Sequence, residues 1–155
     1  MRTRTAQWFE ATVRYERQTE DAGQKKVTEL YTLDALSFAE AEKRITEELQ
    51  PFITGDFDVT KLAIAPYGEI FFSDDTADSY WYKARLAFIT LDERSAKEKR
   101  TTVNFLVQAS SLENARKNIV QAMSPTAIDY EIKAITETTI IDVFEHTPPT
   151  TKKSE

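Results

Sequence analysis

An internal repeat is the feature that most constrains how this chain of 155 residues can fold. The first copy spans residues 8–72 and the second spans 81–144, and the two align with one-residue gaps in predicted loops, where length changes are tolerated. Matching positions include Trp8 with Trp81, Ala41 with Ala115 and Pro51 with Pro125. Self-similarity of this kind indicates a duplicated unit of supersecondary structure.

Both copies show the same order of predicted elements. Alternating apolar and polar residues predict strands over 7–16 and 27–35, joined by a polar hairpin loop at 17–25, and the second copy has its charged hairpin loop at 92–100. Capping serines and the prolines that follow predict helices at 37–49 and 111–123, and a long or broken strand ends each copy. The helical faces expected to be buried are Phe38, Ala41, Ile45 and Leu49 in the first copy, and Leu112, Ala115, Ile119 and Met123 in the second.

This pattern predicts an α+β fold. We expect two tandem strand-strand-helix-strand repeats with pseudo-two-fold symmetry, forming mainly antiparallel sheet with two helices packed on it. One copy alone buries too little surface to be stable, so both copies should form a single domain over 1–146. Residues 147–155 contain no apolar anchor and are predicted to be a disordered tail.

Composition limits the classes of function. The net charge of -6 disfavours non-specific binding to nucleic acid or anionic lipid. No apolar run is long enough to span a membrane, and no signal-peptide core follows the N-terminus, so a cytoplasmic location is expected. The chain has no cysteine, one histidine and three glycines. It therefore lacks thiol chemistry, and scattered glycines cannot build a phosphate-binding loop, so no cofactor is predicted.

The sequence gives little support for a catalytic or a metal site. His146 stands beside the predicted tail, without a nucleophile that could share it as a base. Asp74, Asp75 and Asp78 lie in an acidic linker and could hold a hard cation, but their spacing matches no calcium loop. We therefore predict no catalytic residue and no metal site, and a carboxylate- and metal-dependent enzyme is only the third hypothesis.

Six residues are candidates for binding. Trp8 and Trp81 lie on the otherwise polar side of the first strand of each copy, where they either pack against another element or subunit or form aromatic platforms for a ligand, a peptide or a base. The predicted hairpin loops carry Lys25 and Lys26 in one copy and Lys99 and Arg100 in the other. These cations either belong to solvated, mixed-charge loops or grip a nucleic-acid backbone.

Several segments resemble a domain family of unknown function from Bacteroidetes bacteria. The resemblance covers nearly the whole chain and is carried by residues 4–9, 24–29, 34–38, 69–74 and 142–146. It implies a small intracellular bacterial protein and implies no activity, cofactor or site residue.

The leading functional hypothesis is a non-enzymatic intracellular interaction module that binds a protein or a small ligand. The alternative is a single-stranded nucleic-acid-binding protein, which would use the basic hairpins and the tryptophans. A homodimer is a further arrangement that would cover the tryptophan-bearing face.

Overall fold

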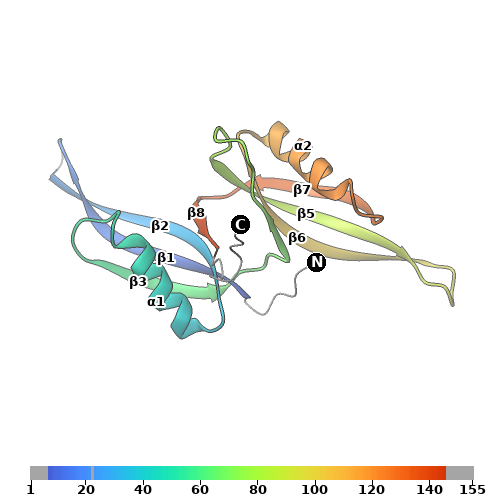
Figure 1. Ribbon diagram of the computed structural model, residues 1–155, viewed down its shortest axis with the longest axis horizontal. Coiled ribbons are helices and arrows are strands. Elements are labelled where there is room, and N and C mark those ends of the chain that lie inside the picture. The colour runs from blue at the N-terminus through green and yellow to red at the C-terminus, as the bar shows by residue number, and fades with distance from the viewer. Residues whose placement is uncertain (1–6, 22, 146–155) are drawn as a thin grey trace, which may run out of the picture. The chain divides into compact units, whose positions relative to one another are not determined.

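The computed structural model describes residues 7–21 and 23–145, and these residues form two helices and two four-stranded sheets (Figure 1). Most strand pairs are antiparallel, so the predicted α+β class is confirmed. The chain divides into unit 1, Met1–Ala65 with Ile140–Glu155, and unit 2, Pro66–Thr139. The single domain over 1–146 stays a prediction, and His146 and the predicted tail at 147–155 lie outside the described residues.

Unit 1 has the strand order β3-β1-β2-β8, with one helix packed on the sheet. Strand β1 pairs antiparallel with both β2 and β3, whereas β8 runs parallel to β2. The element bounds are β1 (Gln7–Thr19), β2 (Gly23–Ala35), α1 (Phe38–Leu49), β3 (Phe57–Ile64) and β8 (Ile140–Phe144).

Unit 2 repeats this arrangement. Its strand order is β4-β6-β5-β7, with β5 antiparallel to β6 and β7 and with β4 parallel to β6. Read in reverse, this order places β7, β5, β6 and β4 where unit 1 has β3, β1, β2 and β8. The bounds are β4 (Glu69–Phe71), β5 (Tyr80–Leu91), β6 (Glu98–Ala109), α2 (Leu112–Met123) and β7 (Asp129–Glu137).

The last strand of each sequence copy pairs with the other copy. Strand β4 ends the first copy but belongs to the sheet of unit 2, and β8 ends the second copy but belongs to the sheet of unit 1. The long or broken strand predicted at the end of the first copy is therefore two strands, β3 and β4, in different sheets. The amide of Ala65 still donates to the Trp8 carbonyl, at 2.8 Å, but the amide of Gly68 already donates to the Asn104 carbonyl, at 2.8 Å.

Both helices begin at a capping serine, as predicted. Ser37 Oγ accepts a hydrogen bond from the Glu40 amide at 3.1 Å, and the Glu40 carboxylate accepts one from the Leu36 amide. In the second helix the cap is Ser111, and the side chain that reaches back to the amide of Ser110 is Asn114. Asn114 thus takes the reciprocal role that Glu or Gln usually has in a capping box.

The predicted helical faces are buried except at their first residues. Ala41, Ile45 and Leu49 are buried in α1, and Ala115, Ile119 and Met123 are buried in α2. Phe38 and Leu112 are 50% and 55% exposed, so the prediction that they are buried is wrong. Each is the first residue of its helix and so lies at the end of the apolar stripe. Phe38 keeps an edge-on contact with Phe9, with the ring centroids 5.0 Å apart.

The predicted hairpin loop at 17–25 is largely strand, whereas the predicted loop at 92–100 is strand only from Glu98 onward. The β1–β2 ladder continues to the pair Thr19–Gly23, and the β5–β6 ladder continues to the pair Leu91–Glu98. Figure 1 shows that both hairpins extend beyond the helix of their own unit. Neither face of the sheet is covered by the helix there, so both faces carry polar residues and the sequence looks like that of a loop. No helix in the described part of the chain is long and apolar enough to cross a membrane.

Candidate functional site

The two tryptophans are buried. Trp8 is 4% exposed and Trp81 is 2% exposed. Asp34, which pairs with Trp8 across β1 and β2 and lies on the same face, is buried too. The Trp81 ring packs edge-on against Phe72, with the ring centroids 5.5 Å apart. Neither indole is therefore exposed in the described structure, as the packing interpretation expects.

The structure separates the basic residues from the tryptophans. Lys25 and Lys26 are successive residues of β2, as Lys99 and Arg100 are of β6, so the two cations of each pair point to opposite faces of their hairpin. Lys26 pairs with Glu16 near the hairpin tip, whereas Trp8 pairs with Asp34 at the other end of the ladder. The geometry does not assemble the basic and aromatic surface that a single nucleic-acid strand would need, and the binding roles of these residues stay predictions.

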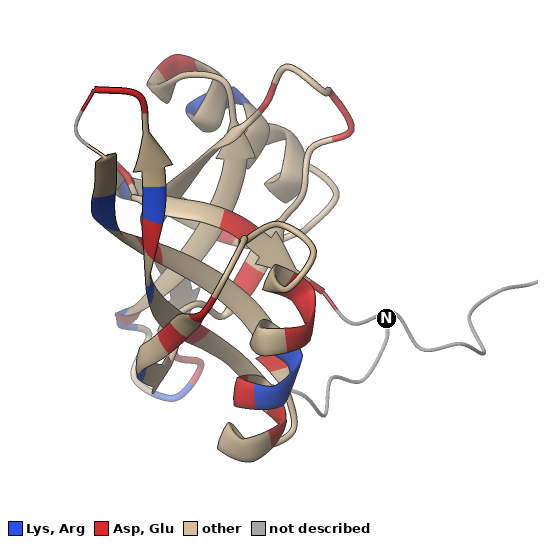
Figure 2. Cartoon of the chain, turned by 90° about the vertical axis from the view of Figure 1, so that its left-hand side faces the viewer, with Lys and Arg blue, Asp and Glu red and all other residues tan. Residues whose placement is uncertain are grey.

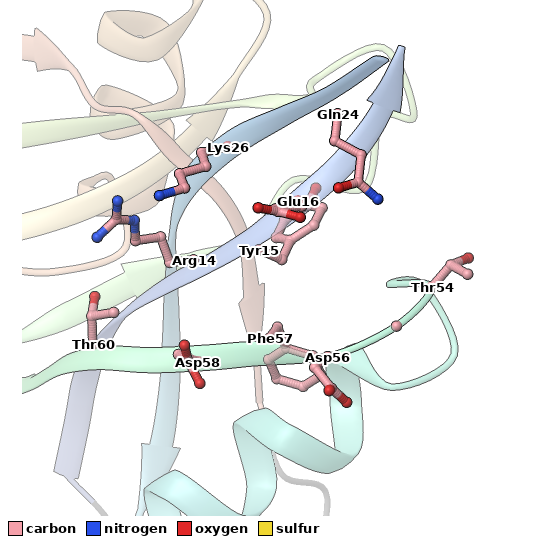
Figure 3. Close-up of a pocket in the computed structure, with 11 residues that line it drawn as sticks. Arg14, Tyr15, Glu16, Gln24, Lys26, Thr54, Asp56, Phe57, Asp58 and Thr60 are labelled. Atoms are coloured by element: carbon pink, nitrogen blue, oxygen red, sulfur yellow. The ribbon is translucent and has the colours of Figure 1, made fainter.

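A polar pocket of about 540 Å³ lies on unit 1 and contains Lys26 (Figure 3). Arg14 and Lys26, from neighbouring strands, point to the same side of the sheet in Figure 3. The lining also contains three carboxylates, those of Glu16, Asp56 and Asp58. In the register, Glu16 lies opposite Lys26, and Asp58 lies opposite Arg14. The opposite charges offset one another, so this pocket does not select for an anion.

The equivalent place in unit 2 holds an ion-pair cluster. Arg100 Nη1 lies 2.8 Å from Glu131 Oε1, and Lys133 Nζ lies 3.3 Å from the same oxygen. Arg100 is on β6 and Glu131 is on β7, so their ion pair crosses β5. The β5 residue opposite Glu131 is Ala87, and unit 1 has Arg14 at the position of Ala87. The hydrogen bond from Arg100 holds the pKa of Glu131 below its ordinary value. All three side chains are about half exposed, so their contribution to stability is small.

Charges of both signs are also mixed on unit 1. Figure 2 shows acidic and basic segments following one another along α1 and the strands, without a continuous field of one sign. Such a surface gives little electrostatic steering toward a polyanion.

The acidic linker makes internal hydrogen bonds. Asp78 is buried, and its carboxylate accepts a hydrogen bond from Ser73 Oγ at 2.5 Å and a longer one from Asn118 Nδ2 at 3.5 Å. Among the described residues, no group of three or more His, Cys, Asp or Glu side chains is placed to hold a metal ion.

A surface groove in unit 2 lies between α2 and the edge strand β7. It consists of two depressions of about 490 and 590 Å³ that share Arg116. We call it the α2–β7 groove, and its apolar lining consists of Leu112 and Val120 from α2 and Tyr130, Ile132 and Ile135 from β7. The register of β7 against β5 shifts between Ile132 and Ala134, which places both Ile132 and Ile135 against the core beneath the groove.

One stripe of the helix forms the upper wall of the groove. Leu112, Arg116 and Val120 recur at intervals of four residues, so they lie above one another on α2. Leu112 and Val120 are 55% and 42% exposed. These two exposed apolar side chains, one on each side of Arg116, form a surface that can bury further area against a partner.

The matching stripe of unit 1 has different chemistry. Phe38, Glu42 and Thr46 occupy the positions that Leu112, Arg116 and Val120 occupy in unit 2. The central charge is reversed, and Thr46 Oγ1 donates to the Glu42 carbonyl at 2.8 Å, along its own helix. Sequence reasoning missed this groove, although the reversal from Glu42 to Arg116 between otherwise similar copies was a signal that could have found it.

A family model described as a domain of unknown function matches residues 7–146. No curated protein matches the chain.

Proposed function

The chain belongs to the domain family of unknown function DUF4494, and from its own geometry we propose that it is a non-enzymatic interaction module that binds a partner along the α2–β7 groove. Of the two partner classes expected from the sequence, a protein segment and a small ligand, the groove favours the protein segment. Its two depressions follow one another along the helix, which suits an elongated partner better than a compact one.

The observation that carries this proposal is the exposure of Leu112 and Val120 above an edge strand. Their burial by a partner would remove apolar surface from water at about 25 cal/mol per Å². The stability of the fold does not require them, because Ala115, Ile119 and Met123 already fill the space between α2 and the sheet. Apolar residues that the core does not use are candidates for contact with another molecule.

The test compares three forms of the full chain as immobilised baits in native lysate: the natural protein, Leu112→Glu, and the matched control Phe38→Glu in unit 1. We expect one stoichiometric protein to be retained by the natural chain and by Phe38→Glu and to be lost with Leu112→Glu. All three forms should keep their circular dichroism spectra, because both positions are half exposed.

Other outcomes would overturn the proposal. Equal retention by Leu112→Glu would place the binding surface elsewhere. Recovery of RNA or DNA that is lost at raised salt would favour the single-stranded nucleic-acid hypothesis, and metal-dependent turnover would favour an enzyme. An intracellular location and an origin in Bacteroidetes are also proposed, and both rest on the family resemblance rather than on the groove.

A further inference from the structure

We propose that the partner in the α2–β7 groove is an extended segment that adds to β7 as an outer strand and presents an acidic side chain, flanked by two apolar ones, to Arg116. This inference rests on the proposed function and defines its partner by chemical class. Three observations support it independently: the edge position of β7, the spacing of the helical stripe and the charge of Arg116.

The edge of β7 is the first observation. Among the residues that the structure describes, β7 pairs only with β5, so its other side presents backbone amides and carbonyls outward. Four successive residues, 130–133, line the depression beside it, and successive strand residues point to opposite faces. The depression therefore lies against the strand edge rather than on one face of the sheet. An open edge of this kind binds extended peptides through main-chain hydrogen bonds.

The spacing of the stripe is the second observation. Residues four apart on a helix are separated by about 6 Å along its axis, and alternate residues of a strand are separated by roughly 6.7 Å. Figure 1 shows α2 running along β7. Three alternate side chains of an added strand can therefore lie opposite Leu112, Arg116 and Val120 in turn.

The charge of Arg116 is the third observation. Within the described residues Arg116 forms no ion pair, whereas the nearby Lys133 is held by Glu131. Glu113 lines the Leu112 end of the groove, so an acidic side chain of the partner is repelled there and attracted to the centre. One face of the bound strand should therefore carry an apolar, an acidic and an apolar side chain in turn, because charge complementarity fixes the register of a partner.

A designed peptide provides the test. The probe is Thr-Val-Thr-Glu-Thr-Val-Thr with a fluorescent label, in which the two valines and the glutamate share one face of a strand. A second probe has lysine in place of the glutamate. Binding to the full chain is measured by fluorescence anisotropy for the natural protein, for Arg116→Glu and for the matched control Glu42→Arg in unit 1.

We expect the glutamate probe to bind the natural protein with an affinity at least ten-fold higher than that of the lysine probe, about 1.4 kcal/mol. Arg116→Glu should reverse this preference, and Glu42→Arg should leave it unchanged. No saturable binding of either probe, or equal binding of both, overturns the inference. If these results occur while Leu112→Glu still abolishes capture of the cellular partner, the groove remains the binding site and only the strand-addition mode is rejected.

Discussion

A buried ion pair in unit 1 shows how single residues differ between two otherwise similar units. Arg44 Nη1 lies 2.8 Å from Asp34 Oδ1 and also donates to the Asp34 carbonyl, which ties α1 to the end of β2. In unit 2 the matching residues are neutral: Asn118 Nδ2 donates to the Gln108 carbonyl at 2.9 Å. The same link between helix and strand is thus made with charge in one unit and without it in the other.

We predict that Arg44→Met lowers the free energy of unfolding by about 3 kcal/mol, because it leaves the carboxylate of Asp34 in a buried site without this cation. Urea unfolding followed by circular dichroism measures the change. The control is Lys43→Met at the neighbouring exposed position, which should stay within about 0.5 kcal/mol of the natural protein. A similar loss in both variants would show that the pair contributes nothing specific.

Tyr31 couples stability to alkaline pH. Its side chain is 6% exposed and donates a hydrogen bond to Glu29 Oε1 at 2.7 Å. Burial, first, and this hydrogen bond raise the pKa of Tyr31 well above its ordinary value. The folded state therefore holds the phenolic proton more tightly than the unfolded state does. This contribution to stability is fully present below pH ~10, the ordinary pKa of tyrosine, and is lost as the pH rises toward the folded pKa.

We predict that Tyr31→Phe makes the loss of stability above pH ~10 shallower than in the natural protein. The residual slope includes Tyr82, whose pKa is also raised by burial. The measurement is a series of urea unfolding curves between neutral and alkaline pH, with the half-exposed Tyr80→Phe as the control. Identical slopes in the natural protein and in Tyr31→Phe would contradict the coupling.

At the scale of elements, α2 has one apolar stripe that packs in the core and another that borders the groove. Ile119 is fully buried in the core of unit 2, and Leu112 borders the groove. Ile119→Ala should therefore cost about 2–5 kcal/mol, since it opens a cavity, whereas Leu112→Ala should cost less than about 1 kcal/mol. Thermal or urea unfolding of both variants measures the difference. A large loss in Leu112→Ala would mean that this residue supports the fold rather than a binding surface.

The turn of the second hairpin carries a backbone conformation that does not suit its residue. Ala96 has φ of 57°, in the left-handed region, and Gly23 at the first hairpin has φ of 73°. No atom lies within 4 Å of the position that a Cβ on Gly23 would occupy, so the cost there is conformational. Ala96→Gly should stabilise the protein by up to about 1 kcal/mol, and Gly23→Ala should destabilise it by a similar amount. Shifts of the same sign in both melting temperatures would refute this explanation.

Local chemistry predicted some elements and could not predict others. The helices were found because serine caps and prolines act within a few residues, as at Ser37 and Pro51. The sheet to which β4 belongs was not predicted, because the three residues of this strand, Glu69–Phe71, do not indicate which sheet they join. The groove was missed because periodicity places Leu112 on an apolar stripe without showing where the stripe leaves the sheet. Burial of Trp8 and Trp81 was one of two interpretations, since alternation alone does not show what covers a face.

At the scale of the whole molecule, the exchange of final strands makes the two sequence copies depend on each other. Fragment 1–76 lacks β8, and fragment 77–155 lacks β4, so each would leave the second strand of its hairpin, β2 or β6, without its parallel partner. We predict that neither fragment alone melts cooperatively and that the full chain does. Far-ultraviolet circular dichroism during heating measures this for each fragment. Two separate, cooperative transitions from the isolated fragments would contradict the dependence and make the copies independent domains.

The same exchange determines the kinetic order of folding. If the two copies were separate molecules, completing either sheet would require a collision between them, and the rate of folding would depend on the product of their concentrations. The covalent connection through residues 72–79 replaces that collision with an intramolecular search. A short linker corresponds to an effective concentration on the order of millimolar, far above the level of most individual proteins in a cell. The chain can therefore complete both sheets at any dilution.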